Sequence, residues 1–108
     1  MSYNVITISR FERQASRLIT KYPSLENELR TLVQSLKENP GQGKHIGHHC
    51  YKIRLAIASK GKGKSGGARV ITFVFIAQYS VYLLSIFDKS EKENLTDKEV
   101  KALLQLLP

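Results

Sequence analysis

Three cationic side chains in the middle of the chain have types and spacing that suit chemistry on a phosphodiester. Lys52 and Arg54 are two residues apart and share one face of a predicted strand, and Arg69 lies near the start of the next strand. Cleavage by a ribose 2′-OH needs a base for that hydroxyl, cations on the phosphorane and a proton donor for the 5′-oxygen. Crowded cations lower the pKa of a lysine, and arginine offers phosphate oxygens a planar fork. The pattern fits RNA cleavage, or phosphate binding alone.

The excess positive charge of the chain surrounds these residues. The 108 residues include 17 Lys or Arg and 9 Asp or Glu, which gives a formal net charge of +8. The concentration of this charge in one segment favours nucleic acid or an acidic protein as a partner over a plain solvated surface. No acidic residue occurs between Asn39 and Phe87, and that span contains Lys44, Lys52, Arg54, Lys60, Lys62, Lys64 and Arg69.

The segment Ser59–Gly67 is predicted to be a flexible basic arm between two strands. Residues 58–65, ASKGKGKS, formally fit a relaxed P-loop pattern. A P-loop continues into a helix, whereas here two glycines and a β-branched strand follow, so a nucleotide site is not expected. The arm either binds phosphates through its lysines or is a disordered, solvated hairpin tip.

Three histidines and the single cysteine occur close together, at His45, His48, His49 and Cys50. Their spacing matches no established ligand set, and the neighbouring cations disfavour a divalent ion, so no metal is expected. His48 and His49 are candidates for a phosphate contact or a proton transfer, and the plain alternative is loop histidines without a role.

The elements that must position these residues follow the order β-α-α-β-β-β-α. Ser9 with Glu12 and Thr96 with Glu99 have capping-box spacing, and Ser24 is a candidate N-cap. The periodicities predict strands at 3–8, 51–58, 68–76 and 81–87 and helices at 9–21, between 24 and 39, and from 96 to 107, with loops at 41–49 and 59–67.

These elements predict an α+β fold with a mainly antiparallel sheet. Three sequential strands form a meander, the first strand joins an edge, and the helical hairpin covers one face. The other face is expected to be free and to carry Lys52 and Arg54. The short C-terminal helix completes the predicted fold.

The length and composition indicate a single domain over residues 1–108. One cysteine excludes an intrachain disulfide, which is compatible with the cytoplasm. The N-terminus does not look like a secretory signal, and no apolar run approaches the roughly 20 residues that span a bilayer. No cofactor is expected.

With this element order, three short motifs resemble the RelE/ParE toxin superfamily. They are CYKIRL at 50–55, GGARV at 66–70, and a strand followed by DKSE at 88–91. The likeness covers nearly the whole chain, and the 59–69 insertion is most similar to HigB-like members of the RelE branch. It implies a bacterial type II toxin that a cognate antitoxin neutralises.

The resemblance also implies an activity. RelE-branch members cleave mRNA in the ribosomal A site by 2′-OH attack, and ParE-branch members poison DNA gyrase. By resemblance Lys52 is the candidate base, and Arg54 and Arg69 stabilise the phosphorane. The family's arginine after the last strand is absent at Ser90, and its C-terminal tyrosine is absent at 95–96, so the general acid is unassigned. Lys89 and Lys92 are candidate replacements for the arginine.

The expected partners are the ribosome, mRNA and an antitoxin of helix-turn-helix type, with oligomers only through the antitoxin complex. The C-terminal helix is either displaced by the antitoxin or ordinary core packing. The alternatives are a ParE-like gyrase poison and an inactive member that binds antitoxin or RNA. The candidate RNA-binding residues are Lys44, His48, His49, Lys60, Lys62, Lys64 and Lys92.

Overall fold

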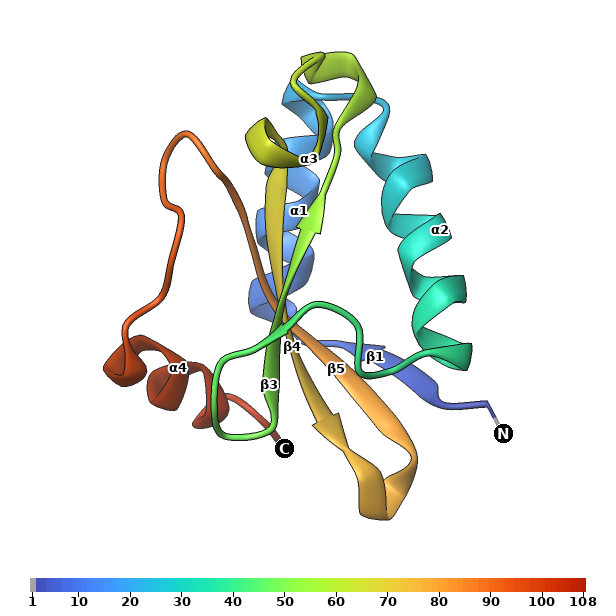
Figure 1. Cartoon of the computed structure of the whole chain (residues 1–108), viewed down its shortest axis with the longest axis vertical. Helices are drawn as coiled ribbons and strands as arrows, with labels where there is room; N and C mark the ends of the chain where they lie inside the picture. Colours follow the sequence, from blue (N-terminus) through green and yellow to red (C-terminus); the bar gives the residue numbers. More distant parts are fainter. Residues whose placement is uncertain (1) are drawn as a thin grey trace.

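A five-stranded sheet in the order β1-β5-β4-β3-β2 forms the centre of the computed structural model, which describes residues 2–108 (Figure 1). The three central strands make the antiparallel meander that the sequence predicts. The first strand runs parallel to β5 at one edge, with Asn4 opposite Ser80. The strands are β1 (Asn4–Thr7), β2 (Lys44–His45), β3 (Cys50–Leu55), β4 (Ala68–Phe75) and β5 (Ser80–Asp88).

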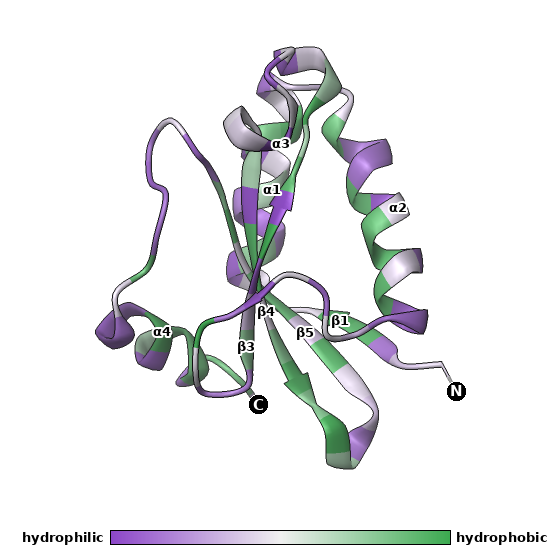
Figure 2. Ribbon diagram, viewed as in Figure 1, coloured by the Kyte–Doolittle hydropathy of each residue, from purple (hydrophilic) through white to green (hydrophobic). Residues whose placement is uncertain are grey.

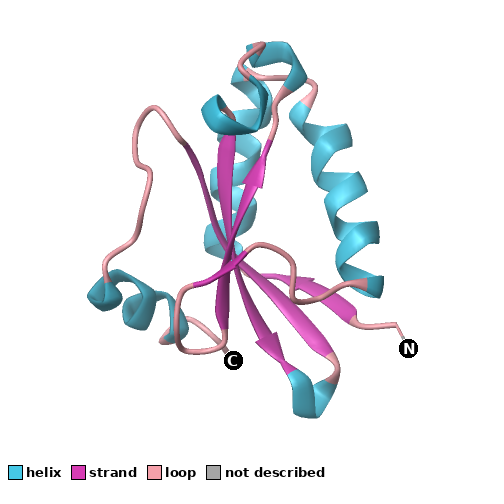
Figure 3. Cartoon of the chain, viewed as in Figure 1, coloured by secondary structure: helices cyan, strands magenta, loops and turns pink. Residues whose placement is uncertain are grey.

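Two helices, α1 (Ser9–Lys21) and α2 (Leu25–Glu38), form the predicted hairpin against one face of the sheet (Figure 3). Each presents apolar residues at helical spacing to that face. Burial of these residues holds the hairpin to the strands. The cluster includes Phe11, Leu18, Leu25, Leu29, Leu32 and Leu36 from the helices and Ile53, Val70, Val74, Val81, Leu83 and Ile86 from the strands.

The opposite face of the sheet is partly covered by α4 (Asp97–Leu104), so the expectation that this face is free is wrong in part. Val100 and Leu103 of α4 pack in one buried cluster with Ile71, Leu84 and Cys50. Cys50 is fully buried, and this burial raises the pKa of its thiol to about 11. Lys52 of β3 lies directly opposite Ile71 of this cluster, and Arg54 follows it toward the end of the strand.

The connections differ from the prediction at two places. The segment expected to be a flexible arm contains a turn of 3-10 helix, η1 (Ala58–Lys60), and a single turn of α-helix, α3 (Gly63–Gly66). Strand β3 accordingly ends at Leu55 rather than at residue 58. The segment 41–49, expected to be a loop, contributes β2, which pairs with β3. A further 3-10 turn, η2 (Ile76–Gln78), joins β4 to β5.

Only one of the three predicted helix caps forms. Thr96 Oγ1 accepts from the Glu99 amide at 3.1 Å, and the Thr96 amide donates to Glu99 Oε1 at 2.9 Å, which confirms that capping box. Ser9 lies inside α1, and Glu12 accepts instead from Thr7. The Ser9 cap is therefore wrong. Ser24 occupies the predicted N-cap position of α2 but makes no side-chain cap bond, because its hydroxyl contacts Ser59 at 2.8 Å.

Hydropathy follows this architecture (Figure 2). Apolar residues occupy the strands and the inner sides of the helices, and polar residues follow the connection from β5 to α4. Within residues 2–108, no helix combines the length and the apolar character needed to cross a membrane. The Cα radius of gyration is 13.0 Å.

Candidate functional site

A groove of about 420 Å³ lies beside β2 and β3 on the second face of the sheet. Lys44 of β2 lies opposite Lys52 of β3, and Arg54 follows Lys52 on the same face. The α3 turn supplies Lys64 to the same wall. Among residues 2–108, no carboxylate lines this groove, so it is suited to a polyanion. The lining is completed by Gln42, Gly43 and Ile53.

Gly43 lets β2 approach β3 closely at this groove. It has φ of +93°, a conformation that side chains other than glycine rarely adopt. A Cβ at Gly43 would lie 2.5 Å from the backbone oxygen of Lys52 and 2.9 Å from Ile53 Cγ1. The close contact between Gly43 and Lys52 places Lys44 next to Lys52.

Lys52 has the clearest electrostatic signature in the groove. Burial lowers its pKa, and the positive charges of Lys44, Arg69 and Arg54 lower it further, while Glu93 opposes the shift. Its ammonium donates to Asn94 Oδ1. A lysine with a lowered pKa supplies a neutral amine more readily at physiological pH, which is the form that can act as a base.

No pattern in the sequence singles out Asn94 and Glu93. Both belong to the connection between β5 and α4, which the bond from Lys52 to Asn94 joins to β3. Their role depends on this path of the chain, and no local pattern indicates it. Glu93 is the acidic residue that acts on both Lys52 and Arg69, where it raises the pKa.

Arg69 is close to the groove residues but does not face solvent. It lies opposite Arg54 across β3 and β4, and its exposed fraction is 1%. Its Nη1 donates to the Lys64 oxygen at 3.0 Å and to the Ala68 oxygen at 3.1 Å, and Nη2 donates to the Ser65 oxygen at 3.3 Å. Within the described part of the chain, Nε has no partner. The predicted phosphate contact therefore requires this backbone to move, although the positive charge of Arg69 still lowers the pKa of Lys52.

Lys60 is placed differently from the other lysines of the basic segment. Its ammonium pairs with Asp88, and the two side chains are 9% and 0% exposed. An ammonium held this way is not free to bind RNA, so we leave Lys60 out of the candidate RNA-binding set. Lys62 is exposed but does not line the groove, and Lys64 does line it.

The remaining predicted site residues lie outside the groove. His48 Nε2 contacts Asp97 Oδ1 at 2.8 Å at the start of α4, and His49 is exposed beside it, with φ of +60°. The Lys89 amide donates to the Gly67 oxygen at 3.0 Å. Lys92 pairs with Glu99. The structure thus brings together Lys44, Lys52, Arg54 and Lys64, with the buried Arg69 beside Arg54 on β4.

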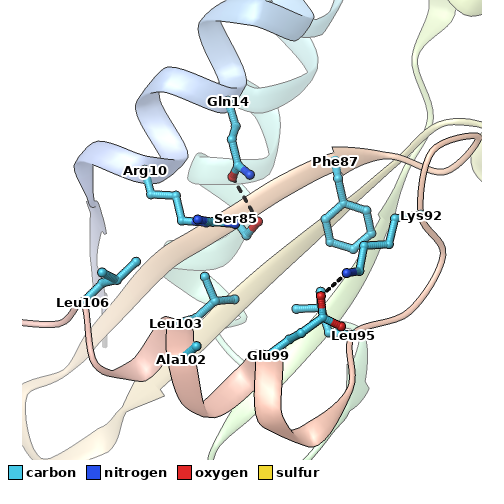
Figure 4. A pocket seen from close by; sticks show the side chains of 10 residues that line it. All are labelled: Arg10, Gln14, Ser85, Phe87, Lys92, Leu95, Glu99, Ala102, Leu103 and Leu106. Carbon is cyan, nitrogen blue, oxygen red and sulfur yellow. Dashed lines mark hydrogen bonds and ion pairs between the residues drawn. The ribbon is translucent and has the colours of Figure 1, made fainter.

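A second hollow, of about 360 Å³, separates α1 from α4 (Figure 4). Its wall is largely apolar, and Lys92 pairs with Glu99 at its rim. The Gln14 side chain of α1 crosses to β5, where its Oε1 accepts from Ser85 Oγ at 3.0 Å and from the Ile86 amide at 3.2 Å. Gln14 thereby satisfies the part of the β5 edge that β1 does not reach.

Across residues 2–108, no three side chains of the His, Cys, Asp and Glu types gather where they could hold one metal ion. The structure therefore offers no candidate ligand set for a bound cation in the part of the chain that it describes.

A comparison with protein families identifies the chain. The model described as the RelE toxin of the RelE / RelB toxin-antitoxin system matches residues 8–107. The chain belongs to the RelE toxin family. The match covers both core clusters and all of the groove, so the RelE-like fold expected from the sequence is confirmed. The nearer likeness to HigB-like members stays a prediction.

Solved structures of RelE proteins share this fold. A double mutant of the E. coli toxin RelE in the free state matches with a TM-score of 0.67 and 19% identity over 94% of this chain and 98% of that chain. The isolated E. coli RelE toxin matches with a TM-score of 0.61 and 17% identity over 98% and 100%. The intact E. coli RelBE toxin-antitoxin complex contains a chain that matches with a TM-score of 0.61 and 20% identity over 81% and 96%.

Proposed function

We propose that this RelE-family chain is a ribosome-dependent mRNA endoribonuclease that acts in the cytoplasm. The observation that carries the proposal is the position of Lys52, whose pKa is lowered by burial and by three neighbouring cations in a groove without carboxylates. A polyanion enters such a groove favourably, and the lysine inside it is prepared to accept a proton.

In the proposed reaction Lys52, as a neutral amine, takes the proton from a ribose 2′-OH. The 2′-oxygen then attacks the adjacent phosphorus, and the bond from phosphorus to the 5′-oxygen breaks. The products are a 2′,3′-cyclic phosphate and a 5′-hydroxyl, whose oxygen takes a proton from water, while Lys52 later releases the proton that it accepted to solvent. The hydrogen bond to Asn94 holds the Lys52 side chain at the groove until RNA replaces it.

The other cations of the groove stabilise charge on the RNA. Arg54 is exposed on the same face as Lys52, and its planar fork suits the oxygens of the phosphorane. Lys44 and Lys64 are placed to neutralise neighbouring phosphates. Arg69 adds positive charge from its buried position opposite Arg54 on β4.

The proposed protein partner is a cognate antitoxin of helix-turn-helix type. The family is that of toxins from a toxin-antitoxin system, and a chain of the E. coli RelBE complex has the same fold as this protein. Co-expression with the neighbouring small gene, followed by co-purification, tests this partner. Failure of every neighbouring small protein to bind would contradict it.

The experiment that tests the activity is induced expression of the wild type and of Lys52→Ala, with mapping of mRNA 5′ ends. The proposal predicts codon-phased cuts in translated messages for the wild type, and their loss in Lys52→Ala. Lys98→Ala is a matched control because Lys98 is an exposed lysine of α4 outside the groove.

Other outcomes point to other functions. Growth arrest without codon-phased cuts would contradict the nuclease, and induction of a DNA-damage response would indicate gyrase poisoning instead. Normal growth, with the protein folded and present, would indicate a member that binds antitoxin or RNA without cleavage.

A further inference from the structure

The basic segment from Ala58 to Gly67 is held to the body of the protein at its first three residues and again from Lys64 to Gly67. At its start, the Ala58 amide donates to Glu28 Oε2 at 2.6 Å, and the Ser59 amide donates to Ser24 Oγ at 2.9 Å. Both acceptors belong to the start of the α2 region. These bonds fix the first turn of the segment against the helical hairpin.

Lys60 fixes the next part of the segment through a buried network around Asp88. Lys60 pairs with Asp88 Oδ1, which also accepts from the Ser90 amide and from Ser90 Oγ, both at 2.9 Å. The other carboxylate oxygen accepts from Tyr22 Oη at 3.0 Å. The Lys60 ammonium also lies 5.7 Å from the centre of the Tyr22 ring. One carboxylate thus joins the segment to the end of α1 and to the end of β5.

The last part of the segment is fixed by the backbone contacts of Arg69 and Gly67. The guanidinium of Arg69 donates to the oxygens of Lys64 and Ser65, and the Gly67 oxygen accepts from the Lys89 amide at 3.0 Å. A Cβ at Gly67 would lie 2.0 Å from the Leu55 oxygen, so only glycine allows this approach to the end of β3.

These attachments determine the position of Lys64. Lys64 is the one residue of the basic segment that lines the groove, next to Arg54. We propose that Lys60 and Asp88 are positioning residues: their buried ion pair fixes the segment so that Lys64 stands at the edge of the groove and contacts RNA there. This inference rests on the proposed function of the groove, and it gives Lys60 an indirect role in place of a phosphate contact.

A double-mutant cycle between Lys60 and Lys64 tests the inference. Lys60→Met and Lys64→Met should each lower kcat/KM for cleavage on programmed ribosomes by roughly tenfold. Lys64→Met removes the cation from the groove, and Lys60→Met releases the segment that holds this cation in place. The double variant should be no slower than Lys64→Met alone, since Lys60 acts through Lys64. If Lys60 contributed only to the stability of the protein, the kcat/KM losses of the two single variants would multiply in the double variant. Lys62→Met is the matched control and should stay within about twofold of the wild type.

Limited digestion with trypsin gives a second measurement that does not depend on activity. In the wild type, the fixed segment should resist cutting after Lys62 and Lys64, even though both residues are exposed. In Lys60→Met, these two cuts should become at least roughly tenfold faster at a temperature where circular dichroism shows the protein folded. Cutting after Lys37, near the end of α2, provides the internal reference.

A second variant keeps the test decisive if Lys60→Met does not fold. The pair Lys60→Met/Asp88→Asn removes both charges, which avoids an unpaired buried charge. The amide oxygen of Asn can accept from the two Ser90 donors, and its NH2 group can donate to the Tyr22 hydroxyl. Trypsin should cut the basic segment of this variant at least roughly tenfold faster than that of the wild type.

The outcomes separate the two proposals. If the wild type cleaves mRNA and losing the ion pair leaves both cleavage and trypsin resistance unchanged, the positioning role is overturned. It is also overturned if the losses from Lys60→Met and Lys64→Met multiply. If the wild type does not cleave, the nuclease proposal fails, and the trypsin result still decides whether Lys60 fixes the segment.

Discussion

Arg54 and Arg69 are direct cross-strand neighbours in β3 and β4, yet only Arg54 reaches solvent. Like charges in such a position repel, so the pair costs stability unless other contacts compensate. Arg69 has that compensation in the backbone oxygens of Lys64, Ser65 and Ala68. The two arginines therefore have separate roles. Arg54 is available to a ligand, and Arg69 binds backbone oxygens of the protein itself.

Replacement of Arg54 should weaken cleavage strongly. Loss of a donor to the developing phosphorane charge typically lowers kcat by 100-fold or more, so Arg54→Ala should show about that loss. Arg54→Lys should recover only part of it, because lysine restores the charge but not the planar fork. Single-turnover cleavage on programmed ribosomes measures both. Full activity of Arg54→Ala would remove Arg54 from the proposed site.

The pH dependence of cleavage should report the lowered pKa of Lys52. The rate should rise with pH as the amine loses its proton, and should level off below the ordinary lysine value of 10.5 because burial and three cations lower the pKa. Lys44→Met removes one of these cations, so it should raise the pKa and move the profile to higher pH. An unshifted profile in Lys44→Met, or an unchanged profile in Lys52→Arg, would contradict the base role.

Neutralisation of Lys44 and Lys64 should change how salt affects binding. Each phosphate contact to single-stranded RNA contributes about 0.7 to the slope of log affinity against log salt concentration. The variant Lys44→Gln/Lys64→Gln should therefore lose about 1.4 of that slope. Fluorescence titration with a non-cleavable 2′-deoxy-substituted RNA measures it. Lys98→Gln, outside the groove, should keep the wild-type slope, and an equal change there would show only a general charge effect.

Because of Asp88, the free energy of unfolding should decrease at acidic pH. Burial pushes its pKa upward, but the bonds from Lys60, Ser90 and Tyr22 outweigh this and hold the pKa well below its ordinary range. Its contribution is therefore fully present above the unfolded-state pKa of about 3.9 and is lost as the pH falls toward the folded value.

Asp88→Asn tests this stability directly. The substitution leaves Lys60 buried without a counter-charge, which typically costs about 3–5 kcal/mol. Urea denaturation at pH 7 should show this loss, and the variant should also lose part of the decline in stability below about pH 4. Asp97→Asn, in an exposed pair with Lys101, should change stability far less. Equal stability of Asp88→Asn and wild type would contradict the network.

Local patterns in the sequence were sufficient for the elements but not for the roles of the side chains. The helical stripes predicted α1, and Thr96 with Glu99 predicted the start of α4, because these features involve neighbours in sequence. The position of Ser24 at the start of α2 was predicted, but the partner of its hydroxyl, Ser59, was not, and Lys60 was misjudged because it binds Asp88. Both partners are distant in sequence.

The candidate site shows the same limit. Alternation along β3 was enough to place Lys52 and Arg54 on one face. The burial of Arg69 and the contact of Lys52 with Asn94 depend on how two connections fold over the strands. The pairing of β2 with β3, which brings in Lys44, extends over only two residues, too few for a periodic pattern.

The parallel pairing of β1 with β5 has a consequence for biosynthesis. Strand β1 finds its partner in β5, at Ser80–Leu83, and β2, β3 and β4 all lie between the two in sequence. The sheet therefore cannot be completed before β5 has been synthesised, because the partner of β1 does not yet exist. During synthesis β1 has to wait while every other strand of the sheet is made, so this edge of the sheet is the last to close.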